Sequence, residues 1–307
     1  MTTAFSSPTL WVITGATAVG KTDYAIKVAQ RHQTCIISAD SRQFYKEMKI
    51  GTASPTLEEL AAVPHYFVGN LSIHDYYNVS QFEEQVLLLL EKLFQKHDVG
   101  IMTGGSGLYI DAVCRGVDTM PDPDSEVRQR VMQLWEDEGV EALRAHLRLL
   151  DPEYCENADL ANHKQMVRAL EVCLQTGLPY SSFRTGSKKE RPFSIVKQCL
   201  ERPREELFNR INRRVDLMME QGLLEEARRL YPHKHLNALN TVGYKELFDY
   251  FEGKLTLERA IEDIKTHTRR YAKRQMTWFK RNKAIKWMPL ENIYPYVINI
   301  INNDAKN

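Results

Sequence analysis

The chain has few of the features that characterise secreted or membrane-spanning proteins. No apolar run approaches the roughly 20 residues needed to cross a bilayer, and the first residues lack the basic-then-apolar pattern of a signal peptide. Cysteines are few, odd in number and scattered without a C-x-x-C pair, which argues against a disulfide framework or a zinc site; they are Cys35, Cys114, Cys155, Cys173 and Cys199. We therefore expect a cytoplasmic protein with no membrane partner.

An excess of charge of either sign is also missing, because 41 Lys and Arg residues oppose 40 Asp and Glu residues for a net charge of +1. This balance hides one asymmetric segment, residues 265–286, which contains no acidic residue. Its basic residues are Lys265, Arg269, Arg270, Lys273, Arg274, Lys280, Arg281, Lys283 and Lys286. A basic segment in a neutral protein indicates local contact with an anionic partner.

The most specific motif is GATAVGKT at residues 15–22, which matches the phosphate-loop pattern G-x-x-x-x-G-K-[ST]. Leu10–Ile13 predicts a buried strand before it, and Asp23–Arg31 predicts a helix after it. In that context backbone amides and the helix N-terminus surround a polyphosphate, Lys21 neutralises its terminal charge, and the Thr22 hydroxyl can hold Mg²⁺. The predicted phosphate-binding residues are Gly15, Ala16, Thr17, Ala18, Val19, Gly20, Lys21 and Thr22. The loop alone leaves open whether the ligand is ATP.

The first third of the chain alternates strand and helix patterns, which predicts an α/β fold with a parallel sheet. The expected strands are Leu10–Thr14, Cys35–Ser38, His65–Val68 and Val99–Thr103. Ser80 and Glu83 match a capping box that would begin a helix reaching about Lys96. Ligands of such sheets bind beyond the carboxyl ends of the strands, so we expect a P-loop NTPase-like sheet, flanked by helices, with its site at that edge.

The middle of the chain predicts a mostly helical insertion domain. Pro121-Asp122-Pro123-Asp124 breaks the chain, and charged helical sequence then continues to about Gly177. We expect residues 115–197 to form this insertion, and residues 1–114 with 198–307 to form the catalytic core. Phe193–Leu200 predicts a strand returning to the sheet, and the chain after Pro203 is mostly helical to about Asn282.

Polar residues follow two of the predicted strands. Asp40–Gln43 follows the second strand, where Asp40 could act as a general base or magnesium ligand, or simply cap a helix. Gly104–Tyr109 follows the fourth strand, where Ser106 offers a hydroxyl, or the segment is only a glycine-rich turn. No aspartate ends this strand as in a Walker B motif, which argues against an ordinary ATPase. The phosphate loop and both segments should converge on one crevice.

Two further groups of charged residues have competing interpretations. Arg210, Arg213 and Arg214 could bind a pyrophosphate from one helix face, or pair in solvent with Glu205, Glu206 or Asp216. In the basic segment, Tyr271, Trp278 and Phe279 are interleaved with Lys and Arg, a pattern that suits stacking on unpaired bases. The alternative is an amphipathic helix with its aromatic side chains in the core. The missing acidic partners favour nucleic-acid contact.

Taken together, these motifs resemble the tRNA dimethylallyltransferase family, also called tRNA isopentenylpyrophosphate transferases. The motifs run in the family's order along nearly the whole chain. They are GATAVGKT (15–22), SADSRQFYKEMKIGTA (38–53), TGGSGLYI (103–110), MPDPDSEVR (120–128), VRALEV (167–172), RINRRVDLMMEQGLLEEA (210–227), TVGYKEL (241–247) and YAKRQMTWFKR (271–281). The most specific are DSRQFYKEMKIGTA and KRQMTWF.

The resemblance implies transfer of a dimethylallyl group from dimethylallyl diphosphate to the N6 amine of the adenosine 3′-adjacent to the anticodon. The acceptors would be tRNAs reading U-initial codons, with Mg²⁺ as cofactor and pyrophosphate as the second product. The phosphate loop would then bind the diphosphate of the donor, which accounts for the missing Walker B aspartate. We expect the enzyme to be a monomer that binds the anticodon stem-loop.

The resemblance also implies roles for individual residues. Asp40 resembles the catalytic base, Thr22 the catalytic magnesium-binding hydroxyl, and Arg214 the catalytic arginine on the diphosphate. The positions that match the family's tRNA interface are Asp40, Ser41, Arg42, Gln43, Ser106, Arg128, Lys164, Gln165, Met166, Val167, Arg168, Asn240, Thr241, Val242, Gly243, Tyr244, Lys245, Lys273, Arg274, Gln275, Met276, Thr277, Trp278, Phe279 and Lys280.

Some positions depart from the family pattern. Ala16 and Val19 replace a proline and a serine, and neither side chain is needed for amide donation. Ser106 replaces threonine and keeps the hydroxyl, whereas Lys164-Gln165 stands where arginines are common. No cysteine follows Trp287, so the zinc finger of eukaryotic relatives is missing, which favours the bacterial form.

Three other functions would use part of these motifs. An adenylate isopentenyltransferase would share the donor site but has no use for the insertion or the KRQMTWFKR segment. An ATP-dependent phosphotransferase of small molecules would require the γ-phosphate. A non-catalytic RNA-binding module would leave Lys21, Thr22 and Asp40 without a role.

Overall fold

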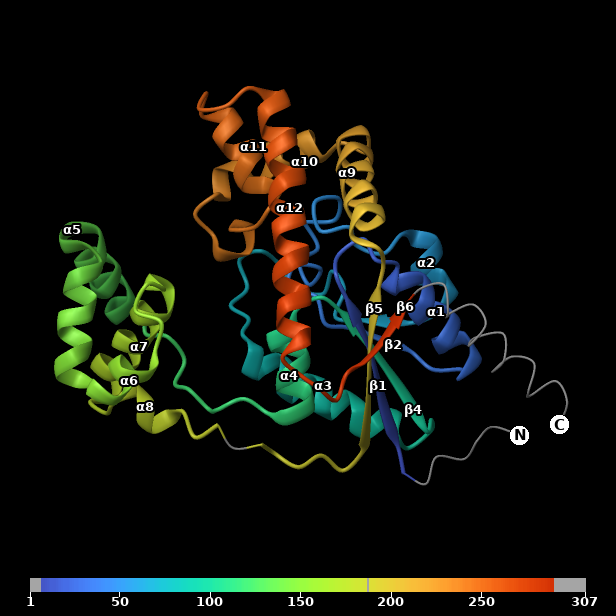
Figure 1. The fold of residues 1–307 in the computed structure, drawn as a ribbon, viewed down its shortest axis with the longest axis horizontal. Helices are drawn as coiled ribbons and strands as arrows, with labels where there is room; N and C mark the ends of the chain where they lie inside the picture. Colours follow the sequence, from blue (N-terminus) through green and yellow to red (C-terminus); the bar gives the residue numbers. More distant parts are fainter. Residues whose placement is uncertain (1–6, 187, 290–307) are drawn as a thin grey trace, which may run out of the picture. The chain divides into compact units, whose positions relative to one another are not determined.

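A computed structural model describes residues 7–186 and 188–289 of the chain. Within these residues, six strands form one sheet in the order β3-β2-β4-β1-β5-β6, and every pairing is parallel (Figure 1). The strands are β1 (Thr9–Gly15), β2 (Ile36–Ser38), β3 (His65–Tyr66), β4 (Val99–Gly104), β5 (Ser194–Glu201) and β6 (Lys286–Pro289). The α/β fold with a parallel sheet is therefore confirmed.

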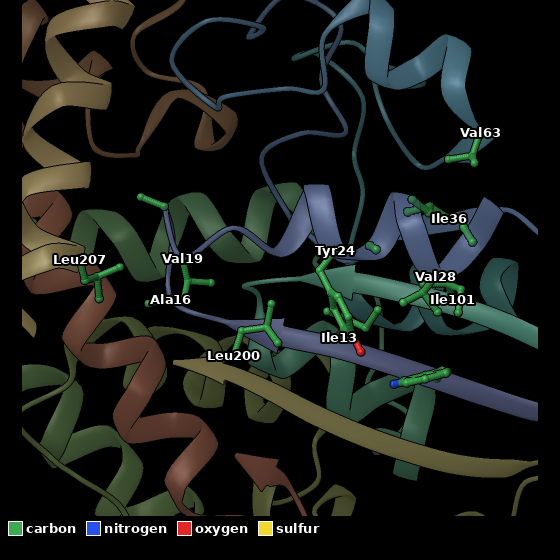
Figure 2. Close-up of a cluster of buried hydrophobic side chains, with 14 of the residues drawn as sticks. Ile13, Ala16, Val19, Tyr24, Val28, Ile36, Val63, Ile101, Leu200 and Leu207 are labelled. Atoms are coloured by element: carbon green, nitrogen blue, oxygen red, sulfur yellow. The ribbon is translucent and has the colours of Figure 1, made fainter. Parts of the chain in front are cut away.

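Helices cover both faces of the sheet, so β1 is buried on both sides. Trp11 and Ile13 point to one face and Leu10 and Val12 to the other, as the twofold alternation of a strand requires. On the first face α1 (Lys21–Arg31) packs through Val28, in the cluster drawn in Figure 2. The second face is covered by α3 (Val79–Leu93) and α4 (Gly107–Arg115). A shorter helix, α2, spans Leu57–Ala62.

The chain after β5 is mostly helical, as predicted. It forms α9 (Arg204–Glu220), α10 (Leu223–Leu230), two short 3₁₀ turns at Tyr231–His233 and Asn237–Leu239, α11 (Tyr244–Phe251) and α12 (Leu257–Lys280). These helices enclose a separate apolar cluster that includes the fully buried Leu223, Tyr244 and Leu247. Tyr45 and Met48 belong to the same cluster, so these helices and the segment after β2 form one body.

Residues 116–189 form a second compact unit with its own core. Its helices are α5 (Ser125–Leu150), α6 (Pro152–Asn157), α7 (His163–Thr176) and α8 (Tyr180–Phe183). Helix α5 is kinked at Gly139, whose φ of 77° lies in the left-handed region where glycine is favoured. Leu143 and Leu147 of α5 pack on α7 in a cluster of buried residues. Residues 194–197, which the sequence assigned to the insertion, belong to β5.

Some local predictions were wrong. The capping box of α3 is formed by Asn78 and Gln81 rather than by Ser80 and Glu83. Glu83 is instead buried in an ion pair with Arg191 at 2.7 Å, so its side chain is not free to cap the helix. Strand β3 ends at Tyr66 because Phe67 adopts a positive φ of 62°. Strand β6 was not predicted.

In the part of the chain that the structure describes, no helix is long and apolar enough to span a bilayer.

Candidate active site

A cavity of about 430 Å³ opens at the carboxyl edge of the sheet. Its walls include Lys21 and Thr22 from the phosphate loop, Asp40 after β2 and Gly104 at the end of β4. The three polar segments that follow these strands therefore converge on one crevice, as the sequence predicted. Arg210 and Arg214 of α9 complete the polar part of the wall.

The phosphate loop has the tight backbone that its glycines predict. Gly15 has a φ of 148°, and a Cβ there would lie 2.7 Å from the carbonyl oxygen of Leu200 on the neighbouring strand. Gly20 precedes α1 with a φ of 109°. The first helical residue is Lys21, so the free amides at the N-terminus of α1 face the cavity, a site suited to an anion.

Lys21 folds back over its own loop, where its Nζ donates to the carbonyls of Gly15 at 3.1 Å and Ala16 at 2.8 Å. Burial lowers the pKa of Lys21 to about 8, while the nearby Asp40 carboxylate acts in the opposite direction. A bound polyanion would favour the charged ammonium further. Binding of a diphosphate should therefore raise the pKa of Lys21 above its value in the free protein.

Three arginines from the chain after β5 contact residues of the phosphate loop. Arg210 donates from Nε to the carbonyl of Ala18 at 2.9 Å, and Arg214 lies 3.5 Å from the hydroxyl of Thr17. Arg202, which the sequence analysis missed, donates to the carbonyl of Val19 at 2.8 Å. Burial, then the neighbouring Arg210, lowers the pKa of Arg214, but a guanidinium keeps its charge.

The suggested pairing of the α9 arginines with nearby carboxylates is wrong for Glu206 and Asp216. Glu206 pairs with Arg202 and Asp216 pairs with Lys265. Arg213 is exposed and does not line the cavity, whereas Arg210 and Arg214 border it.

Asp40 is held beside the turn after β4. Its Oδ1 accepts from the backbone amide of Arg42 at 3.0 Å, and the amide of Ser41 donates to Oγ of Ser106 at 3.0 Å. The two strand ends approach closely because position 104 is glycine; a Cβ there would lie 2.2 Å from the carbonyl oxygen of Ala39. Asp40 therefore begins a local turn and caps no helix of the described chain.

A second, smaller cavity of about 110 Å³ also has Asp40 in its wall. It shares Thr17 and Arg214 with the first cavity, and its other walls come from Thr241–Gly243 and Tyr271. Asp40 thus stands between the cavity that the phosphate loop borders and a cavity lined by α12 and the loop before α11. Burial raises the pKa of Tyr271 well above its usual range, so this hydroxyl stays protonated.

The two residues after Ser41 have partners inside the protein. Arg42 donates to the carbonyls of Asn237 at 2.9 Å and Ala238 at 3.1 Å. Gln43 donates to the carbonyl of Ala53 at 3.0 Å. Both side chains therefore fix neighbouring loops, and contact with RNA stays a prediction for them.

Gln275 joins two of the converging segments. Its side-chain oxygen accepts from the amide of Thr17 at 2.8 Å, and its side-chain nitrogen donates to the carbonyl of Gly105 at 3.0 Å. Gln275 is 5% exposed. Its side chain therefore ties α12 to the phosphate loop, and contact of Gln275 with tRNA stays a prediction.

Helix α12 divides the basic segment between solvent and core. Lys273, Arg274, Thr277 and Lys280 are exposed, and Trp278 is 36% exposed. Phe279 is buried in the sheet core, which excludes it from an RNA surface. Lys265, at the start of the segment, pairs with Asp216 and Glu262, which lie outside residues 265–286.

Residues 240–245 divide in the same way. Asn240 and Lys245 are exposed, Thr241 and Val242 are half-buried, and Gly243 and Tyr244 are buried. Tyr244 is fully enclosed in the apolar cluster of the last helices. The prediction that its side chain contacts tRNA is therefore wrong.

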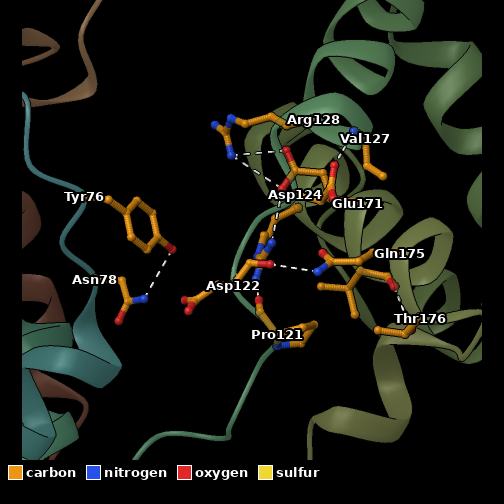
Figure 3. Close-up of polar contacts among 12 residues, drawn as sticks. Tyr76, Asn78, Pro121, Asp122, Asp124, Val127, Arg128, Glu171, Gln175 and Thr176 are labelled. Atoms are coloured by element: carbon orange, nitrogen blue, oxygen red, sulfur yellow. Dashed lines mark hydrogen bonds and ion pairs between the residues drawn. The ribbon is translucent and has the colours of Figure 1, made fainter.

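In the insertion, a buried carboxylate holds two arginines of the predicted tRNA surface. Glu171, 1% exposed, pairs with Arg128 at 3.1 Å (Figure 3). It also pairs with Arg168 at 3.3 Å. Both arginines remain partly exposed, so each can bind a further anion. Lys164 and Gln165 are exposed, whereas Met166 and Val167 are buried in the insertion core and cannot form an RNA surface.

The described residues contain no group of three or more His, Cys, Asp or Glu side chains arranged to hold a metal ion. Mg²⁺ does not need such a cage, because it commonly binds one or two protein oxygens together with phosphates and water. The Thr22 hydroxyl borders the cavity with the carboxylates of Asp23 and Asp40. This donor set fits Mg²⁺ bound with a diphosphate.

A parallel sheet with a phosphate loop after its first strand, and with arginines rather than a Walker B aspartate around the cavity, defines a P-loop transferase. The family model described as IPP transferase matches residues 43–282. The chain is 57% identical over 279 residues to tRNA dimethylallyltransferase 1 of Phocaeicola vulgatus, which covers 91% of this chain and 93% of that protein. It is 52% identical to tRNA dimethylallyltransferase of Christiangramia forsetii over 94% of this chain and 97% of that protein.

Solved structures of enzymes from the same family are similar to this chain. The full-length tRNA isopentenylpyrophosphate transferase of Bacillus halodurans has a TM-score of 0.70 and 33% identity, covering 96% of each chain. A eukaryotic dimethylallyltransferase solved in action on tRNA has a TM-score of 0.76 and 26% identity, over 92% of this chain and 74% of that chain. The chain belongs to the tRNA dimethylallyltransferase family and is a prenyltransferase of this class.

Proposed function

We propose that this protein transfers a dimethylallyl group from dimethylallyl diphosphate to N6 of the adenosine 3′-adjacent to the anticodon, in tRNAs that read U-initial codons. Membership of the family supports the reaction class. The observation that carries the assignment is the position of Asp40 on the wall shared by two cavities. Donor and acceptor can therefore approach the same carboxylate from different sides.

The larger cavity suits the donor. Its diphosphate would bind at the N-terminus of α1, with Lys21 and Arg214 on the leaving group. Cleavage of the carbon–oxygen bond builds negative charge on pyrophosphate, and fixed cations and amides stabilise that charge as it develops. The same cavity is also lined by Ile36, Leu217 and Met218, apolar residues that suit the prenyl chain.

The smaller cavity suits the acceptor. An adenine has to leave its stack to reach such a site. The N6 amine would bond to the prenyl carbon while its proton passes to Asp40. Because an amine becomes a stronger nucleophile as its proton is taken, this transfer lowers the barrier. Tyr271 and Thr241–Gly243 would surround the base.

Mg²⁺ is the proposed cofactor, with Thr22 as the protein ligand implied by the family and the donor diphosphate as its principal partner. When bound, the ion supplies positive charge to the leaving pyrophosphate. Thr22 remains available for this role, since it borders the cavity at the first turn of α1. Chelation with EDTA should abolish transfer, and added Mg²⁺ should restore it.

The tRNA surface is proposed to consist of the exposed residues of each unit. In the core unit these are Lys273, Arg274, Thr277 and Lys280 on α12, with Asn240 and Lys245 nearby in the chain. In the insertion they are Arg128, Lys164, Gln165 and Arg168. Lys and Arg side chains of this kind bind phosphates and position an RNA. We propose that the enzyme acts as a monomer.

A competition between acceptors tests this function against the free-nucleotide and phosphotransferase alternatives. Purified protein is mixed with radiolabelled dimethylallyl diphosphate, Mg²⁺ and unmodified tRNA reading U-initial codons, with parallel reactions containing AMP or ATP. Label on tRNA alone is the expected result. Label on AMP or ATP would instead identify a free-nucleotide prenyltransferase, and label on neither would overturn the proposal.

A further inference from the structure

Lys49–Ala53, a segment of the loop after β2, turns around a buried carboxylate that the reaction chemistry does not use. Glu226 of α10 is 3% exposed. Its Oε2 accepts from the backbone amides of Lys49 at 3.0 Å and Ile50 at 2.9 Å, and its Oε1 accepts from the amide of Gly51 at 2.9 Å. Three consecutive amides thus converge on one charged side chain, and hydrogen bonds to a charged group are stronger than neutral ones.

Tyr244 of α11 provides a fourth hydrogen bond to Glu226, from its hydroxyl to Oε1 at 2.7 Å. Burial raises the pKa of Tyr244 far above its usual range, so the hydroxyl remains a donor. The approach of this ring requires glycine at position 51, because a Cβ there would lie 2.6 Å from the ring and its hydroxyl. Glu226, Tyr244 and Gly51 therefore act as one assembly.

The segment held by this assembly lines the donor cavity. Lys49, Ile50, Thr52 and Ala53 all border it, facing the same space as Leu217 and Met218 of α9. The opposite end of the segment is fixed by Gln43, which donates to the carbonyl of Ala53. Ala53 has a positive φ of 49°, a strained conformation that persists only where surrounding contacts impose it. Glu226 lies outside the cavity lining and acts through the segment.

We infer that Glu226 is a positioning residue for Lys49–Ala53. By holding this segment it sets the shape of the part of the donor cavity that would enclose the prenyl chain, and thereby the chain length of the prenyl group accepted. This inference rests on the proposed function, since it assigns the apolar part of that cavity to the prenyl chain. Replacing the carboxylate with an amide removes the charge and sets an NH₂ group against backbone N–H donors. The segment would then no longer be held in one position.

The test compares Glu226→Gln with Glu225→Gln, an exposed neighbour on the same helix. We expect Glu226→Gln to raise KM for dimethylallyl diphosphate about tenfold, with a smaller change in kcat. The ratio of kcat/KM for dimethylallyl diphosphate to kcat/KM for geranyl diphosphate should therefore fall. Inhibition by inorganic pyrophosphate should be unchanged, since the phosphate loop keeps its own supports. Glu225→Gln should match the wild type in every measurement.

Tyr244→Phe provides a milder variant that removes one of the four hydrogen bonds and keeps the packing ring. It should shift the preference between the two prenyl donors in the same direction by a smaller factor. A folded Glu226→Gln or Tyr244→Phe protein with wild-type KM and donor preference would overturn the inference. Loss of thermal stability with unchanged donor preference would also overturn it. Absence of transfer by the wild type would instead contradict the proposed function.

Discussion

The side-chain oxygen of Gln275 accepts a hydrogen bond from the backbone amide of Thr17 at 2.8 Å. Thr17 belongs to the phosphate loop, and Gln275 lies on the helix whose exposed side carries Lys273 and Arg274. One helix therefore presents cations to solvent on one side and supports the phosphate loop on the other. Neighbouring residues of α12 should have separable effects on the two substrates.

Gln275→Ala should raise KM for dimethylallyl diphosphate by about tenfold while leaving the Kd for tRNA nearly unchanged. The reason is that truncation removes a buried partner of the Thr17 amide and of the Gly105 carbonyl, and unpaired buried groups cost about 1–3 kcal/mol. Steady-state kinetics and filter binding measure the two quantities. A loss confined to tRNA affinity would show that Gln275 contacts RNA after all.

Lys273→Ala should have the opposite effect. Its exposed ammonium is expected to contact a phosphate, so its removal should weaken tRNA binding and lower the slope of log Kd against log salt by about one ion. Filter binding across a salt series measures this. If the slope is unaltered, Lys273 belongs to a solvated helix face.

Asp40→Asn should lower kcat by about 10²-fold or more while tRNA affinity changes little, because the amide cannot accept the N6 proton. Asp98→Asn is a matched control, since Asp98 is exposed and precedes β4 at the opposite edge of the sheet. Single-turnover kinetics and filter binding distinguish the two effects. Unchanged kcat in Asp40→Asn would remove Asp40 as the base.

Arg214→Ala should raise KM for dimethylallyl diphosphate about tenfold or more, because a half-buried guanidinium beside Thr17 would be lost from the leaving-group site. Arg213→Ala provides the control, since Arg213 is exposed on the same helix. Should only tRNA affinity respond to the Arg214 change, its assignment to the diphosphate is wrong.

The affinity for inorganic pyrophosphate should depend on pH through Lys21. Burial lowers the pKa of Lys21 to about 8, so the free protein holds it charged below that pH and neutral above it. A polyanion binds the charged form, and pyrophosphate Kd should therefore rise as the pH increases above about 8. Calorimetric titration of the wild type and of Lys21→Arg measures this. Equal pH dependence in both proteins would exclude Lys21 as the titrating group.

The same shift has a consequence for folding. The unfolded chain holds a proton on Lys21 up to its ordinary pKa of 10.5, whereas the folded protein releases it at about 8. Between these two pH values the unfolded state binds more protons at Lys21 than the folded state does. The contribution of Lys21 to the free energy of unfolding therefore increases as the pH rises from about 8 to 10.5.

The parts of the site that follow strands could be predicted from sequence, because a parallel sheet brings strand ends to one edge. GATAVGKT and Asp40 are examples. The supports from distant segments could not: Glu226 is 177 residues from Lys49, and Gln275 is 258 residues from Thr17. No local pattern encodes such pairings, so both residues matched helix or RNA-contact patterns instead.

The α3 N-terminus shows a different limit. Asn78–Gln81 and Ser80–Glu83 are overlapping patterns that both satisfy the capping-box rule. The choice depended on Arg191, which binds Glu83 from 108 residues away. Burial of Phe279 and Tyr244 was likewise decided by packing between segments. The pattern of the basic segment did not distinguish a buried Phe279 from an RNA-facing one, and the interface role of Tyr244 was implied only by the family resemblance.

The most direct test of the central claim is to locate the transferred group. Unmodified tRNA reading U-initial codons is incubated with the protein, dimethylallyl diphosphate and Mg²⁺, then digested with ribonuclease and analysed by tandem mass spectrometry. We expect a dimethylallyl group on N6 of the adenosine immediately 3′ of the anticodon, and none when that adenosine is replaced by guanosine. A tRNA that stays unmodified, or a group attached at another position, would contradict this expectation.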